Sequence, residues 1–73
     1  MKKRPNVVNL KLLKKEREKR KIYQKDLAKA LGKTPEAYCM QELGLARFAI
    51  HEAIIIRDYF GFTDEETKRI FGL

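Results

Sequence analysis

The sequence predicts a small all-α domain, and three observations carry that prediction. Apolar residues recur at the 3.6-residue spacing of helices. Capping residues and glycines mark where successive helices begin and end. The length of 73 residues suits one hydrophobic core and leaves no material for a second. We therefore expect five helices around one core, with residues 1–8 as a basic arm and residues 9–73 as a single domain.

The first two helices are predicted from their caps and apolar stripes. Asn9 can cap the free amides of a helix that begins after it. The charged run KKEREKRK (14–21) should lie in water, and a second helix follows over 22–32. Gly32 ends that helix because glycine readily adopts the left-handed conformation. The expected buried stripes are Leu10 and Leu13 in the first helix and Ile22, Leu27, Ala28 and Leu31 in the second.

A third helix should start immediately, because Thr34 is a good cap and Pro35 suits the first helical position. It runs to Gly44, with Tyr38 expected in the core. Two helices joined by a short bend containing a glycine are typical of the helix-turn-helix arrangement.

The fourth helix is predicted over 48–61, ending at Gly61. Its β-branched run 54–56 would also suit a strand, but the spacing of its apolar residues favours a helix. The residues expected to share its buried face are Ile50, Ala53, Ile56 and Phe60. Thr63 and Glu66 form a capping box that opens a short fifth helix ending near Phe71.

The net charge of +7 is unevenly distributed along the chain. Residues 1–33 carry 13 basic and 3 acidic side chains, whereas residues 34–73 carry 4 basic and 7 acidic ones. The basic half could attract nucleic acid or an anionic protein, or its lysines could simply be solvated.

Composition argues against several functional classes. No apolar run approaches the ~20 residues needed to cross a bilayer, and no secretory signal is recognisable. The single cysteine, Cys39, fits the reducing cytoplasm of a cell. Neither Cys39 nor His51 has a partner at catalytic or metal-ligand spacing. We expect a cytoplasmic protein that is not an enzyme and holds no metal or cofactor.

Two segments carry a resemblance to a known family. QKDLAKALGKTPEAY (24–38) resembles the helix-turn-helix of the lambda-type repressor and Cro family. RFAIHEAIIIRDYFGFTDEETKRIF (47–71) resembles the tail of small regulators from temperate phages of Gram-positive bacteria. The resemblance covers about residues 10–71. It implies a lambda-repressor-like fold whose third helix is offered to the major groove of DNA.

This third helix is poorly equipped to read DNA. Direct reading needs Arg, Lys, Asn or Gln side chains aimed at base edges. The expected outward positions are Thr34, Pro35, Glu36, Cys39, Met40 and Leu43. Gln41 could read adenine, but the helical periodicity points it sideways.

Polar and apolar residues are exchanged around this helix relative to the family. Glu42 stands where the family places a buried aliphatic residue, and Leu43 and Leu45 stand where it favours Asn and Lys. An exposed apolar cluster with an acidic rim suits a protein partner. The predicted partner-binding residues are Glu36, Cys39, Met40, Glu42, Leu43 and Leu45. In the alternative orientation, the helix rotates to bury Leu43 or Leu45 and to expose Glu42.

Within the phage group, the sequence resembles the modulator-of-repression proteins. That resemblance implies an antirepressor that binds the amino-terminal DNA-binding domain of a phage repressor and influences the choice between lytic and lysogenic growth. The basic half could contact phosphates, either weakly and by itself or co-operatively with the repressor on the same DNA. The alternative is a Cro-like repressor that binds operator DNA through Gln24, Lys33, Thr34, Gln41 and Arg47.

Overall fold

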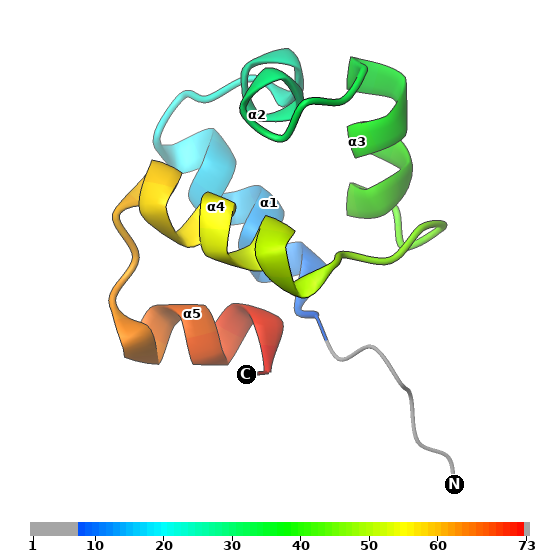
Figure 1. Ribbon diagram of the computed structural model, residues 1–73. Coiled ribbons are helices and arrows are strands. Elements are labelled where there is room, and N and C mark those ends of the chain that lie inside the picture. Colours follow the sequence, from blue (N-terminus) through cyan, green and yellow to red (C-terminus); the bar gives the residue numbers. More distant parts are fainter. Residues whose placement is uncertain (1–7, 73) are drawn as a thin grey trace, which may run out of the picture.

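The computed structural model describes residues 8–72 and contains five helices and no strand within that range (Figure 1). The helices are α1 (Leu10–Lys19), α2 (Gln24–Ala30), α3 (Pro35–Glu42), α4 (Ile50–Phe60) and α5 (Asp64–Phe71). The predictions of an all-α fold and of a helix rather than a strand over 54–56 are confirmed.

The predicted caps determine where these helices begin and end. The side chains of Asn9 and Thr34 each accept an amide N–H from the first turn of the following helix, both at 3.1 Å. Thr63 and Glu66 exchange side chain–backbone hydrogen bonds of 2.8 and 3.1 Å, which is the predicted capping box. Gly32 has a φ of +71°, a conformation that strains other residues, and it redirects the chain from α2 towards α3.

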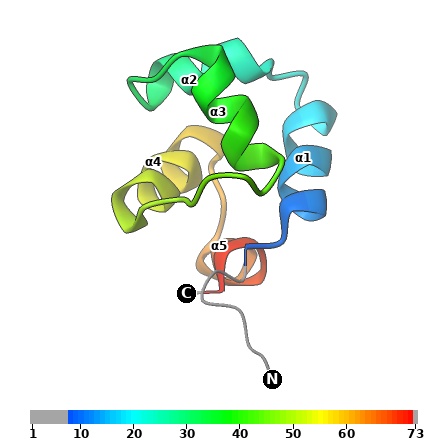
Figure 2. The ribbon, with the colours of Figure 1, turned by 90° about the vertical axis from the view of Figure 1, so that its right-hand side faces the viewer.

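Figures 1 and 2 show how the helices surround the core. In Figure 2, α3 lies between α1 and α4, with α2 above them and α5 below. Accordingly, α1 contacts α3 and α5, α2 contacts α3 and α4, and α4 contacts α5. The backbone N–H of Asn9 donates to the carbonyl of Ile70 at 2.6 Å, which joins the start of α1 to α5.

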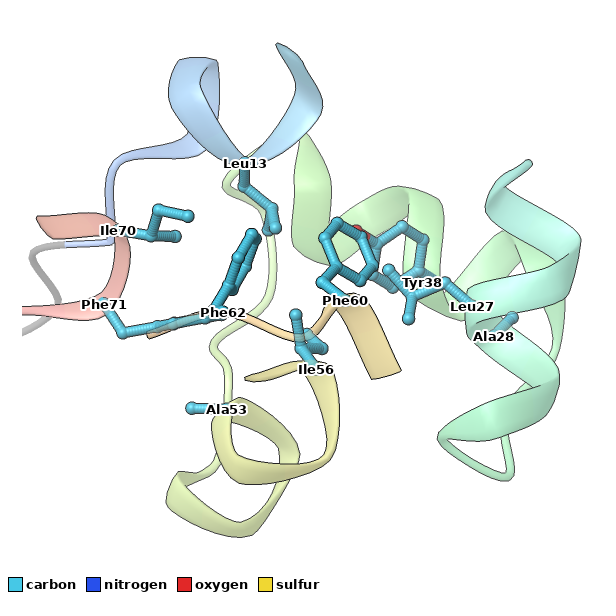
Figure 3. Close-up of a cluster of buried hydrophobic side chains, with 10 residues drawn as sticks. All are labelled: Leu13, Leu27, Ala28, Tyr38, Ala53, Ile56, Phe60, Phe62, Ile70 and Phe71. Carbon is cyan, nitrogen blue, oxygen red and sulfur yellow. The ribbon is translucent and has the colours of Figure 1, made fainter. Parts of the chain in front are cut away.

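All five helices contribute to one hydrophobic core (Figure 3). Phe48, in the segment before α4, packs edge-on against Tyr38 and Phe71, with ring centroids 6.2 and 5.7 Å away. Tyr38 is fully buried, as predicted. The buried hydrophobic residues are Leu13, Leu27, Ala28, Tyr38, Ala53, Ile56, Phe60, Phe62, Ile70 and Phe71.

Two predicted burial assignments outside α3 are wrong. Ile50, expected on the buried face of α4, is 70% exposed. The helix begins at Ile50 itself, and the buried position in its first turn is taken by Glu52, whose carboxylate accepts the Ala49 N–H at 2.9 Å. Arg17, expected in water with the rest of its charged run, is buried.

The predicted arm lies almost entirely in residues 1–7, outside the described part of the chain, as does Leu73. Val8, assigned to the end of that arm, is half-buried and packs against the core. Val8 is therefore part of the folded domain.

Candidate interaction surface

Helix α3 buries two polar side chains, Gln41 and Glu42, beside the core residue Tyr38, and it leaves apolar side chains exposed. Its buried residues are Tyr38, Gln41 and Glu42. By contrast, Met40 and the C-cap residue Leu43 are 46% and 65% exposed. Burying charged and amide groups is unfavourable unless each finds a partner, so the inner face requires a complete set of polar contacts.

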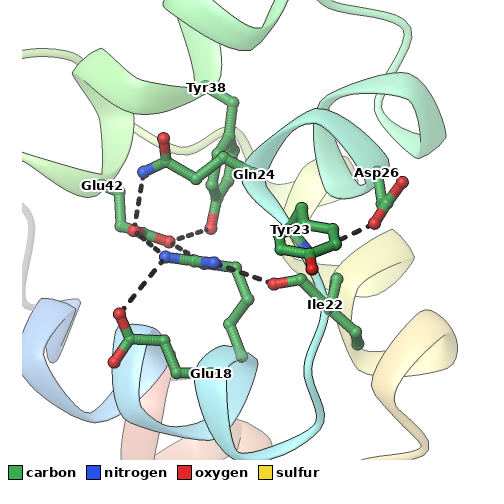
Figure 4. A network of polar contacts seen from close by, with 8 residues as sticks. Glu18, Ile22, Tyr23, Gln24, Asp26, Tyr38 and Glu42 are labelled. Atoms are coloured by element: carbon green, nitrogen blue, oxygen red, sulfur yellow. Dashed lines mark hydrogen bonds and ion pairs between the residues drawn. The ribbon is translucent and has the colours of Figure 1, made fainter.

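Glu42 is the centre of the first of two polar networks (Figure 4). The Arg17 guanidinium of α1 donates to both Glu42 carboxylate oxygens at 2.9 Å, forming a bidentate ion pair. The Tyr38 hydroxyl donates to Glu42 Oε2 at 2.7 Å, and the Gln24 amide donates to Oε1 at 2.9 Å. A further Arg17 N–H donates to the carbonyl of Ile22 at 2.8 Å. These contacts join α1, α2 and α3 through one carboxylate.

This arrangement keeps the buried pair ionised. Burial alone would raise the pKa of Glu42, but the hydrogen bonds from Arg17, Tyr38 and Gln24 outweigh it and hold the pKa below its usual value. The hydrogen bond to Glu42 raises the pKa of Arg17 in turn. Burial, with a contribution from Glu42, raises the pKa of Tyr38, which therefore remains a hydroxyl donor.

A second network fixes the other side of α3 to α4. The Gln41 amide donates to Glu52 Oε1 and to the carbonyl of Arg47, both at 2.8 Å. Lys33, in the bend after α2, pairs with the second Glu52 oxygen. Burial would raise the pKa of Glu52, but the Ala49 amide, Lys33 and Gln41 lower it overall. The orientation of α3 is thus set by polar contacts through Glu42 and through Gln41.

These networks correct the predicted place of Glu42 and the alternative orientation of the helix. Glu42 was expected on the acidic rim of an exposed patch, but it is only 7% exposed and bonded on every side, so that expectation is wrong. The rotated alternative is also wrong, because Glu42 is buried while Leu43 and Leu45 are 65% and 69% exposed.

The residues predicted for DNA reading are largely occupied within the domain. Gln41 is 1% exposed and cannot reach a base, which contradicts its place in that set. Gln24 bonds Glu42, Lys33 pairs with Glu52, and the Thr34 hydroxyl caps α3. Arg47 is exposed and forms no side-chain ion pair within residues 8–72.

Five of the predicted partner-binding residues are at least partly exposed, on α3 or just after it. We call this set the outer α3 surface. Cys39 is partly exposed, and Glu36 is the only acidic member. The members are Glu36, Cys39, Met40, Leu43 and Leu45.

The burial of Arg17 and Glu52 was not predicted, although a signal for each exists. Arg17 lies four residues after Leu13, and Glu42 lies four residues after Tyr38, so each shares a helix face with a core residue. Glu52 stands three residues after the cap position Ala49, where a carboxylate can satisfy the cap amide. A search for opposite charges on predicted buried faces would have paired Arg17 with Glu42.

The side chains and helix lengths in the described part of the chain bear on a metal site and on a membrane-spanning helix. His51 is exposed, and Cys39 is a free thiol. Within residues 8–72, no three His, Cys, Asp or Glu side chains gather as potential metal ligands. None of the helices there has the length and apolar character needed to span a bilayer.

No protein-family model, curated protein or solved structure matches this chain.

Proposed function

We propose that this chain is a helix-turn-helix regulator of the lambda-repressor-like type that acts as an antirepressor. In this proposal, the outer α3 surface binds the DNA-binding domain of a phage repressor. One observation carries the proposal: Gln41 is the only Arg, Lys, Asn or Gln in α3, and it is buried in the contact with Glu52. The outward side of this helix therefore has no Arg, Lys, Asn or Gln side chain with which to read base edges.

The chemistry of the outer α3 surface suits a protein better than DNA. Met40, Leu43 and Leu45 offer apolar area that gains free energy when a partner covers it. Methionine is flexible and adapts to irregular partner surfaces. Glu36 repels phosphate but attracts a basic surface. The DNA-binding face of a repressor is such a surface, since it must hold phosphates.

The biological role comes from the resemblance to modulator-of-repression proteins. Occupation of the repressor's DNA-binding face would exclude the operator, and a lysogenic cell would then enter lytic growth. The buried networks support this by presenting the outer α3 surface in one fixed orientation, which lowers the entropic cost of binding.

The test is release of a repressor from its operator. The repressor is the one encoded by the same prophage, and its operator complex is followed by gel shift while this chain is added. We expect the wild-type chain to release the repressor and Met40→Glu to fail. Tyr59→Glu is the matched control, because Tyr59 on α4 is also 46% exposed. Equal activity of wild type and Met40→Glu would place the interface elsewhere.

A Cro-like operator-binding repressor is the second candidate. The exposed Arg47 and the lysine-rich first half favour it. It requires a preference for operator over scrambled DNA that survives moderate salt, whereas the antirepressor proposal requires no such preference. Gel shifts of this chain alone, with both duplexes at two salt concentrations, separate the two.

A further inference from the structure

We propose that the exposed face of α1 is a separate, sequence-independent binding site for the phosphate backbone of nucleic acid. This site lies outside the outer α3 surface and does not depend on the antirepressor role. The exposed residues of α1 are Lys11, Lys14, Lys15, Glu18 and Lys19. Four of these five side chains are lysines.

Most of these lysines form no close ion pair in the described part of the chain. Lys11, Lys14 and Lys15 form no ion pair within residues 8–72, whereas Lys19 shares Glu16 with Arg20. Lys11 and Lys15 stand one turn apart, which places them roughly 6 Å apart along the helix axis. A row of unpaired charges at this spacing suits a regular array of phosphates.

The side chains on this face favour nucleic acid over a membrane or a base-reading role. Membrane-surface helices insert an apolar face, but Leu13 is buried and Leu10 and Leu12 are half-buried within the domain. No exposed residue of α1 is apolar. Lysine is a flexible point charge that binds phosphate without fixed geometry, so no sequence preference is expected.

The exposed lysines belong to α1 and the outer α3 surface to α3 and the residues just after it, and Figure 2 shows α1 and α3 as separate, neighbouring helices. The Arg17–Glu42 pair holds α1 against α3 and leaves the lysines outward. A protein partner on the outer α3 surface and a nucleic acid on α1 therefore need not compete.

The experiment measures binding of the full chain to a random-sequence DNA duplex by fluorescence anisotropy. The salt concentration is varied from ~50 to ~200 mM, because ~4 phosphate contacts would weaken the affinity by roughly a hundredfold over that range. Lys11→Gln with Lys15→Gln removes two charges from the site. Lys68→Gln with Arg69→Gln on α5 removes two exposed charges elsewhere and is the matched control.

We expect the α1 variant to bind at least ~tenfold more weakly at 50 mM salt and to lower the salt slope by about 2. The α5 variant should retain wild-type binding. Equal weakening by both variants would mean that binding depends on net charge alone, which would overturn the proposal. Absence of DNA binding by the wild-type chain would overturn it as well. Preferential binding to anionic lipid vesicles or polyglutamate would assign the face to those partners instead. Met40→Glu, which disables the proposed antirepressor surface, should leave this DNA binding unchanged, so the two proposals fail separately.

Discussion

The two faces of α3 differ in an unusual way, because polar side chains are buried beside Tyr38 on the inner face and large apolar side chains are exposed on the outer face. The inner face holds Gln41 and Glu42, whereas Met40 and Leu43 face solvent. An apolar inner face would pack in several rotations at similar cost, but a carboxylate that needs Arg17, Tyr38 and Gln24 together accepts only one. The polar contacts of the inner face therefore set the rotation of α3 about its axis. That rotation leaves Met40 and Leu43 exposed to solvent.

The largest effect should follow from breaking the inner face. Arg17→Met leaves Glu42 buried without its cation, which costs about 3–5 kcal/mol of unfolding free energy. A domain of 73 residues has about 4–11 kcal/mol in total. Urea unfolding should therefore show the loss of a large share of the unfolding free energy at 25 °C. A loss below ~1 kcal/mol would mean that the pair does not hold α3.

Apolar replacement of three members of the first network tests whether that network adds net stability. Arg17→Met, Tyr38→Phe and Glu42→Leu together remove the ion pair and the tyrosine hydroxyl and leave only the half-buried Gln24 of the network. Replacing a buried ion pair by apolar residues is often neutral or stabilising by about 1–4 kcal/mol. We expect the triple variant to unfold at wild-type urea concentrations or above. Stability as low as that of Arg17→Met alone would show that the network contributes net stability and not only orientation.

The second network should give a smaller loss. Gln41→Leu removes the two hydrogen bonds donated to Glu52 and to the Arg47 carbonyl, which costs about 1–3 kcal/mol. The Gln41 Oε1 atom is buried and has no hydrogen-bond partner within residues 8–72, so its removal offsets part of that loss. Thermal unfolding followed by circular dichroism measures the change. An increase in melting temperature would contradict the assigned role.

Acid should lower the unfolding free energy of the domain, because Glu42 and Glu52 lose their charges at low pH. The folded-state pKa values of Glu42 and Glu52 are lowered, so their stabilisation is complete above the unfolded value of about 4.3 and is lost as pH falls through the folded values. Unfolding free energy should therefore rise with pH in the acid range and level off above it. In Glu42→Gln the acid slope should be shallower, and an unchanged slope would assign the dependence to other carboxylates.

The smallest stability effect belongs to the outer face. Leu43→Ser changes a side chain that is 65% exposed, so unfolding free energy should change by no more than ~0.5 kcal/mol. Its effect on repressor binding, by contrast, should be large if the outer α3 surface is the interface. A stability loss above ~1 kcal/mol would mean that Leu43 packs within the domain.

The helices were predictable because their signals are local. Asn9, Thr34 and Thr63 cap as expected, and the glycine after α2 adopts the expected left-handed conformation. Each depends on a few neighbouring residues, so the sequence alone determines it.

The inner face of α3 was not predictable in the same way. Arg17 and Glu42 look like solvated charges in their own segments, and they become a core pair only when α1 meets α3, 25 residues apart in sequence. Ile50 was misplaced for a related reason, since Glu52 takes the buried position through contacts with Gln41 and Lys33 from other elements. Long-range polar pairing overrides the local hydrophobic pattern at these positions.

The most direct test maps where a repressor touches this domain. Titration of the isotope-labelled chain with the repressor's DNA-binding domain should shift or broaden the amide resonances of Glu36, Met40 and Leu43, and leave those of α5 unchanged. Operator DNA added alone should not perturb these three amides in a sequence-dependent way. Perturbation confined to α1 or α5, or a specific response of α3 to operator DNA, would contradict the account.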